Sequence, residues 1–180
     1  MAEEFEIFDE LGNRIGTAPR SEVHRKGYWH RASNVFLFYP DGRLLIQRRQ
    51  TTKDVWPGAW DVSAAEHLMP GETFEQGAHR GLREELGVVG ATLEVFGAVT
   101  KSKLEVPESG IRDFEFQQSF RTVYGGHVSP DLAEVMETRA VDPEQLASEF
   151  AMHPQTFTPW FRQRAMDLEL FSSWPGVAAA

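Results

Sequence analysis

The sequence predicts an α+β fold with helices packed on a mixed β-sheet. Short apolar segments with the period-two alternation of strands recur along the chain, and helical segments interrupt them at irregular intervals. Such spacing favours a mixed sheet over a doubly wound parallel sheet. The chain has 180 residues, 41% of them hydrophobic, so it can bury a substantial core in one domain. We expect this domain to span residues 1–175, with a disordered tail at 176–180.

Two hairpins are predicted in the N-terminal part of the chain. Residues 4–18 are expected to form the first, with a turn near 11–13. The second is predicted over residues 33–49, because two apolar runs flank Pro40-Asp41-Gly42 and Asp-Gly favours a tight turn. Further strands are predicted at 60–68, 91–102, 112–124 and 134–141, and helices at 143–150 and 158–170.

The segment 71–87 predicts a further helix, with an acidic face. Thr73 and Gln76 have the spacing of a capping box, and Gly87 is placed to end the helix. Gly77 and Gly81 lie inside it, where each costs about 1 kcal/mol relative to alanine. Either another group approaches the helix backbone closely at these positions, or the segment is a solvated acidic helix with an unfavourable interior.

The composition excludes several classes of protein. A formal net charge of −9 argues against a non-specific grip on nucleic acid or an anionic membrane surface. The absence of cysteine excludes disulfides, thiolate metal sites and a thiol nucleophile. No apolar run approaches the ~18 residues of a membrane span, and the N-terminus lacks a signal-peptide pattern. We therefore expect a cytoplasmic protein with a small-molecule partner; the sequence leaves the oligomeric state open.

Residues 66–88 resemble a Nudix box, whose pattern is G-x5-E-x7-R-E-U-x-E-E-x-G-U with U apolar. The matching residues are Glu72, Arg80, Leu82, Glu84, Glu85, Gly87 and Val88. The resemblance implies the Nudix fold, an α/β/α sandwich, and hydrolysis of a diphosphate attached to another group. It also implies that Glu84 and Glu85 hold Mg²⁺ or Mn²⁺ against the phosphates. Carboxylates suit these hard cations, which neutralise a diphosphate and help to generate a nucleophile.

The box departs from its pattern at two positions. Glu66 stands where the pattern has glycine, and Gly81 stands where it has the first glutamate of R-E-U. One hypothesis is that the Glu66 carboxylate occupies the space vacated at Gly81 and takes over its role. The alternative is that Glu66 points to solvent and the box is catalytically impaired.

Much of the chain is also similar to type I isopentenyl-diphosphate isomerases, which share the Nudix fold. The similarity covers about residues 5–165 and is carried by "HRKGYWHRASNVFLFYPDGRLLIQRRQTTKDVWPGAWDVSAAEH", "SGIRDFEF", "EVMETRAV" and "TFTPWF". It implies a divalent-metal site with the ligands His24, His30, His67, Asp113 and Glu115. Strand alternation independently places the two acids on one face. Mixed imidazole and carboxylate ligands suit Mn²⁺, Zn²⁺ or Fe²⁺ better than Mg²⁺.

The same resemblance implies a diphosphate site. The residues that match its phosphate contacts are Arg20, Arg49 and Lys53, and guanidinium and ammonium groups are suited to phosphate oxygens. Glu85, with backbone oxygen near Ala65, matches a Mg²⁺ site beside the diphosphate. Trp160 matches an aromatic residue that stacks over a carbocation-like centre. The alternatives are solvated surface charges for the basic residues and an ordinary core position for Trp160.

Two of the three residues that carry out proton transfer in the isomerases are not retained. Ala65 stands at the position of the isomerase cysteine and Lys103 at that of its tyrosine, whereas Glu115 is kept. We therefore expect metal-dependent hydrolysis of a diphosphate linkage in a small organic or nucleoside substrate. Glu85 would hold metal, and Glu115 or Glu66 would activate water. The alternatives are an isomerase with altered catalytic residues and a non-catalytic module that binds a diphosphate.

Overall fold

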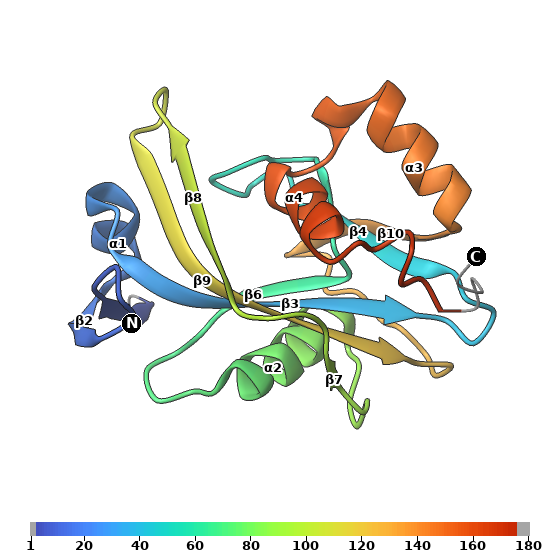
Figure 1. Ribbon diagram of the computed structural model, residues 1–180, viewed down its shortest axis with the longest axis horizontal. Coiled ribbons are helices and arrows are strands. Elements are labelled where there is room, and N and C mark those ends of the chain that lie inside the picture. The colour runs from blue at the N-terminus through green and yellow to red at the C-terminus, as the bar shows by residue number, and fades with distance from the viewer. Residues whose placement is uncertain (1–2, 176–180) are drawn as a thin grey trace.

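A computed structural model of the protein describes residues 3–175 and has a central sheet with helices on both faces (Figure 1). The helix at 74–86 lies against one face, and the C-terminal helices lie against the other. The N-terminal strands and a short helix lie at one end of the sheet. The predicted α+β fold, an α/β/α sandwich, is therefore confirmed.

The elements of the described chain have the following bounds. The strands are β1 (Glu4–Phe8), β2 (Arg14–Pro19), β3 (Trp29–Phe38), β4 (Leu44–Arg49), β5 (Trp60–Asp61), β6 (Ala64–His67), β7 (Glu94–Val95), β8 (Thr100–Val106), β9 (Ile111–Val123) and β10 (Val135–Val141). The helices are α1 (Arg20–Lys26), α2 (Phe74–Leu86), α3 (Pro143–Met152) and α4 (Pro159–Asp167), with a 3-10 turn at Pro154–Thr156. Within residues 3–175, no helix is long and apolar enough to cross a membrane.

Strand β3 is the centre of the sheet. It pairs in parallel with β9, and antiparallel with β6, β1 and β4, so the sheet is mixed. Strand β10 follows β4 at one edge, β2 follows β1 at the other, and β8 forms a hairpin with β9. The register places His30 beside Glu115 and Ala32 beside His67. Polar residues of three strands are thereby aligned on one face.

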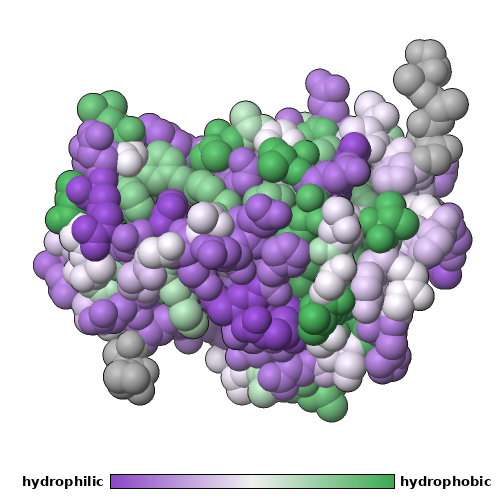
Figure 2. Space-filling view, turned by 90° about the horizontal axis from the view of Figure 1, so that it is seen from below, coloured by the Kyte–Doolittle hydropathy of each residue, from purple (hydrophilic) through white to green (hydrophobic). Residues whose placement is uncertain are grey.

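The alternation of β3 divides the core into two layers. Val35 and Leu37 pack against Leu82 and Leu86 of α2. Phe36 belongs to the other layer, which also contains Phe38, Ile46, Phe157, Phe161 and Trp174. Each such side chain contributes roughly 1.5–3 kcal/mol when fully buried. The outer side of α2 faces solvent, and Figure 2, seen from that side, shows hydrophilic side chains gathered over the middle of the face.

The termini of α2 match the prediction. The Thr73 hydroxyl accepts a hydrogen bond from the backbone N–H of Gln76, and the Gln76 side chain accepts one from the backbone N–H of Thr73. Gly87 ends the helix with φ 65°. The capping box therefore fixes where the helix begins, and the left-handed glycine fixes where it ends.

The interior glycines of α2 allow two close approaches. A Cβ atom on Gly77 would lie 2.9 Å from Cδ1 of Leu68. A Cβ atom on Gly81 would lie 3.0 Å from Cβ of Glu66. The helix thus lies so close to β6 and to the residue that follows it that a side chain at either position would force its neighbour to shift. This finding favours the first of the two explanations for the glycines.

Several elements differ from the sequence predictions. Helix α1 is absent from them, although Pro19 before it and Gly27 after it, at φ 70°, are signals of its ends. Segment 60–68 forms two short strands, and most of 91–98 is irregular. Helix α4 ends three residues before position 170. The predicted hairpin at 4–18 is confirmed, whereas the tail at 176–180 lies outside the described residues.

Candidate active site

Side chains from α1, β3, β6 and β9 converge in one cluster, which we call the histidine–carboxylate cluster. Its members are His24, His30, His67, Asp113 and Glu115. One potential ligand atom from each of the histidines and Asp113 lies within 4.8 Å of the others. His30 Nε2 is 3.2 Å from Asp113 Oδ1, and His67 Nε2 is 3.1 Å from Glu115 Oε1. The fold therefore brings together the residues that the resemblance names.

The donor atoms of this cluster fit a bound cation. Nε2 of His24, Nε2 of His30 and Oδ1 of Asp113 are buried without a hydrogen-bond partner among the described residues. Nδ1 of His30 donates to the backbone oxygen of Tyr28 at 3.0 Å, which leaves its Nε2 lone pair directed away from that bond. Burying such atoms without partners is costly, and a divalent cation would satisfy all of them.

The N-terminal hairpin supports the cluster, a role that sequence patterns did not indicate. The ring of Phe5 on β1 is stacked on His30 at 5.3 Å between centroids and lies 4.8 Å from the ring of His67. Phe5 is 1% exposed. An apolar ring therefore shields the imidazoles from solvent and fixes their planes.

Burial and neighbouring charges set the protonation of the cluster. Burial lowers the pKa of His24 to about 3, although the charge of Asp113 opposes this effect. Burial raises the pKa of Asp113, but the three imidazoles outweigh it and hold the pKa below its usual range. Burial lowers the pKa of His67, but Glu115 outweighs it and the pKa is raised. A neutral His24 and an ionised Asp113 are the forms that bind metal.

The Nudix-box residues form a second group on the side of α2. The stem of Glu66 fills the space beside Gly81, while its carboxylate reaches Nη1 of Arg80 at 3.1 Å. Glu85 is buried; its Oε1 accepts a hydrogen bond from the backbone N–H of Ala65 at 3.1 Å, and its Oε2 accepts one from the Gln47 side chain. The two glutamates therefore face each other across a helix position that carries no side chain.

Burial raises the pKa of Glu85 to about 8, and the charge of Glu66 adds to this effect. Burial likewise raises the pKa of Glu66, against the opposing charge of Arg80. Glu84 lies closer to solvent and contacts Nη1 of Arg80 at 3.3 Å. Two neighbouring carboxyl groups with raised pKa values, which repel each other when both are ionised, are a feature of sites that bind a cation.

The basic residues lie along a groove of about 1230 Å³ that also contains Glu66, Glu84 and Glu85. Arg20, at the start of α1, is paired with Asp54 at 3.1 Å. Lys53 is paired with Glu134, and Arg49 lies 3.2 Å from Asp61. All three predicted cations therefore border the carboxylates, although each has an acidic neighbour that a bound diphosphate would have to displace or share.

Asp61 organises the far wall of the site and was missed by the sequence patterns. The carboxylate is 0% exposed and accepts hydrogen bonds from Nε1 of Trp160 at 2.8 Å and from the Thr158 hydroxyl at 3.0 Å. The Arg49 guanidinium is 5.1 Å from the centre of the Trp160 ring. Burial raises the pKa of Asp61, with Arg49 as the main opposing charge. Trp160 is thus held by its indole N–H at the border of the pocket.

We expect Asp61→Ala to destabilise the protein by about 3–5 kcal/mol, because it leaves the guanidinium of Arg49 without its buried partner. Thermal unfolding should show a melting temperature lower by about 10 °C. Asp61→Asn is the matched control; it keeps an acceptor for Trp160 and should lose less. An unchanged melting temperature for Asp61→Ala would contradict this account.

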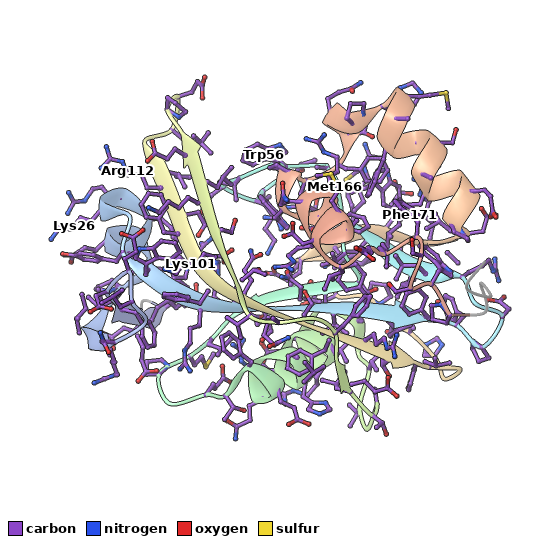
Figure 3. The ribbon with its side chains drawn as sticks, viewed as in Figure 1. Lys26, Trp56, Lys101, Arg112, Met166 and Phe171 are labelled. Carbon is purple, nitrogen blue, oxygen red and sulfur yellow. The ribbon has the colours of Figure 1, made fainter. Side chains whose placement is uncertain are left out.

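Trp56, on the loop between β4 and β5, packs edge-on against Trp160 with centroids 5.6 Å apart. Its φ of 46° lies in the left-handed region, which bulky side chains rarely adopt. Trp56 is labelled in Figure 3, and Trp160 lies in the first turn of α4. Strained backbone of this kind concentrates at binding sites, where surrounding contacts hold it.

The position of Lys103 differs from what the isomerase resemblance suggests. Lys103 pairs with Phe114 on β9, so its side chain projects from the face opposite Glu115. Its Nζ lies 5.2 Å from the ring of Trp29 and 3.2 Å from Oε1 of Glu10. Lys101 projects from the same side of β8 (Figure 3). Neither lysine reaches the cluster, and Ala65 supplies only a methyl group.

The protein is a sandwich of two helical layers about a mixed sheet, and acids of α2 lie on the same groove as His67 of the histidine–carboxylate cluster. Residues 28–161 match the family model of the NUDIX domain, and the chain belongs to this family, in its isopentenyl-diphosphate isomerase-like branch.

Three comparisons illustrate the relationship. The isopentenyl-diphosphate Delta-isomerase of Streptomyces avermitilis is 38% identical over 157 residues, which are 87% of this chain and 78% of that protein. Nudix hydrolase 3 of Arabidopsis thaliana is 47% identical over 91 residues, 49% of this chain but 12% of that protein. The crystal structure of DR0079 from Deinococcus radiodurans aligns with a TM-score of 0.74 over 92% of this chain and 99% of that chain, at 20% identity, and so supports the fold.

Proposed function

We propose that this protein hydrolyses a diphosphate linkage in a small organic or nucleoside substrate, with a divalent cation such as Mg²⁺ or Mn²⁺. The observation that carries the proposal is the facing pair of glutamates, Glu66 and Glu85, at Gly81. They border the same groove as the basic residues Arg20, Arg49 and Lys53. This arrangement combines cation ligands with phosphate contacts.

The residues of the chain have distinct roles in the proposed reaction. Glu85, Glu84 and the histidine–carboxylate cluster would hold the cations, and the basic residues would orient phosphate oxygens. A bound cation would supply positive charge on the diphosphate and lower the pKa of a water molecule. Glu115 or Glu66 would accept the proton from the attacking water. The P–O bond of the linkage then breaks, and the leaving phosphate oxygen takes the electron pair.

Isomerisation is the second candidate, and specific features favour it. The histidine–carboxylate cluster and Trp160 match the isomerases, and several relatives carry that name. Against it, Ala65 cannot exchange a proton and Lys103 lies on the opposite face of the sheet. One of the two faces at which carbon must be protonated or deprotonated therefore lacks a suitable group. A silent diphosphate-binding module remains the third candidate, from a different class.

A ³¹P NMR time course on metal-free protein tests the proposal. Isopentenyl diphosphate and common nucleoside diphosphate derivatives are supplied together, and Mg²⁺ and Mn²⁺ are added in turn. We expect metal-dependent release of phosphate or a nucleoside monophosphate. Unchanged phosphorus signals would overturn the hydrolase proposal for these substrates. The ¹H spectrum of the same sample would then show whether the double bond has shifted, and ligand-induced stabilisation without turnover would indicate a binding module.

A further inference from the structure

Asn34 carries a buried amide that the proposed reaction does not use. The residue is 2% exposed on β3 and lines a pocket of about 60 Å³ together with Ala65, Gln117 and Trp160. Its Nδ2 atom is buried, and no group within the described residues accepts a hydrogen bond from it. Buried polar groups in native proteins nearly always have a partner, so this donor requires one from outside the chain.

The register of the sheet places this amide on the floor of the pocket. Asn34 is opposite Ala65 on β6 and beside Ser119 on β9, and residues paired in this way project from the same face. The Ser119 hydroxyl is also buried without a partner in the described chain. The methyl group of Ala65 leaves the amide room, whereas the Ser119 hydroxyl is fully buried and does not line the pocket.

The neighbouring polar side chains already have partners. Nε2 of Gln117 donates to Oε2 of Glu115 at 2.5 Å, and the indole N–H of Trp160 donates to Asp61. These bonds leave Asn34 as the free amide donor among the described residues that line the pocket. The pocket has a volume of about 60 Å³ and can admit a small group of a ligand.

We propose that Asn34 forms a polar subsite that binds a hydrogen-bond acceptor, such as a carbonyl or hydroxyl oxygen, on the organic part of the substrate. The inference rests on the proposed function, because it takes the diphosphate to lie along the neighbouring groove. A site with a buried donor rejects an analogue that lacks the acceptor, since the donor is then left unpaired. The substrate is therefore a diphosphate of a small oxygenated alcohol, not of an alkenyl alcohol.

Two isosteric probes test this subsite. Acetonyl diphosphate and methallyl diphosphate differ in that a carbonyl oxygen replaces a methylene group. Binding of each to the wild-type protein with Mn²⁺ is measured by calorimetry, and phosphate release is followed by ³¹P NMR. We expect the acetonyl compound to bind at least about tenfold more tightly, and to react with a correspondingly higher kcat/KM if hydrolysis occurs.

Substitutions locate the preference. Asn34→Leu has nearly the same size and no donor, and Asn34→Ala removes the amide altogether; both should bind the two probes equally. The matched control is Gln118→Leu, which removes a buried amide bonded to backbone oxygens and absent from the pocket lining. It should keep the wild-type preference. Melting temperatures establish that each variant is folded, and Asn34→Ala decides if Asn34→Leu is not.

The outcomes separate the two proposals. Equal binding of both probes to the wild-type protein overturns the subsite, as does a preference that survives both substitutions; an ordered water would then be the partner of Asn34. Preferential binding of the acetonyl compound without phosphate release supports the subsite and overturns the hydrolase proposal for this compound. Hydrolysis of both probes at equal rates overturns the subsite and supports the hydrolase. If neither probe binds, the subsite proposal is overturned, and the hydrolase proposal is decided by the nucleoside derivatives of the ³¹P NMR test.

Discussion

The double substitution Glu66→Gly with Gly81→Glu is expected to retain metal-dependent phosphate release. Gly81→Glu alone is expected to lower the rate of phosphate release at least about 100-fold. The single change places a side chain where Cβ would lie 3.0 Å from Cβ of Glu66. Removing the Glu66 side chain frees that space, and the new glutamate supplies the carboxylate from the helix. The double substitution also restores the consensus of the Nudix box at both positions.

Further variants separate crowding from loss of the carboxylate. Gly81→Ala should lower the rate of phosphate release only by crowding the Glu66 side chain. Glu66→Gln should preserve the packing of that side chain while lowering metal affinity. Metal titration by calorimetry and the phosphate-release assay measure both effects. If Glu66→Gln left metal affinity and activity untouched, Glu66 would have no role in the site. Wild-type activity of Gly81→Glu would contradict the close approach of β6 to α2.

Glu85→Gln is expected to lower the rate of metal-dependent phosphate release at least about 100-fold. The same substitution is expected to raise the stability of the metal-free protein. The loss follows because a neutral amide binds a divalent cation poorly. The gain follows because Glu85 is buried beside Glu66, with its pKa raised to about 8. Gln47 can rotate its own amide to present its oxygen to the new side chain, so the hydrogen bond is retained.

The raised pKa of Glu85 also predicts how the stability of the metal-free protein changes with pH. The folded-state pKa of Glu85, about 8, lies above the ordinary glutamate value of 4.5, so between these values the folded protein holds more protons than the unfolded chain. The contribution of Glu85 to stability is thus fully present below about pH 4.5 and is lost as pH rises through 8. Glu85→Gln removes this dependence.

Melting temperatures of metal-free protein at several pH values test this account. At pH 8 the variant should melt at least about 5 °C above the wild type, and the difference should shrink toward pH 5. Glu84→Gln is the matched control, since Glu84 is exposed and should change neither stability nor its pH dependence appreciably. A difference that grew toward low pH would contradict the assignment. Cation binding to the wild-type protein should release protons and strengthen with pH.

This chain shares the metal-binding residues of the isomerases but differs at the residues that would transfer protons. The cluster of histidines and acids is present, and its unpartnered ligand atoms fit a cation. The positions that would move protons on carbon hold Ala65 and an outward-facing Lys103. The free amide of Asn34 adds a polar group to the pocket. These features together favour a substrate that differs from isopentenyl diphosphate.

The sequence by itself determined the local features of the protein. Capping residues fixed the ends of α2, Asp-Gly fixed the turn between β3 and β4, and the alternation over residues 112–124 placed Asp113 and Glu115 on one face. These features depend on neighbours within a few residues, which a single sequence displays directly. The resemblance to the Nudix box and to the isomerases also indicated which residues, distant in the sequence, belong to one site.

Only the tertiary structure decided which distant groups touch. The reason for Gly81 is the stem of Glu66, the orientation of Trp160 is set by Asp61, and the shield over the histidines is Phe5. Each of these contacts joins separate elements of the fold, and no periodicity in the chain encodes them. The direction of Lys103 and the missing partner of Asn34 likewise follow from strand register, which arises when the whole sheet is packed between its helices.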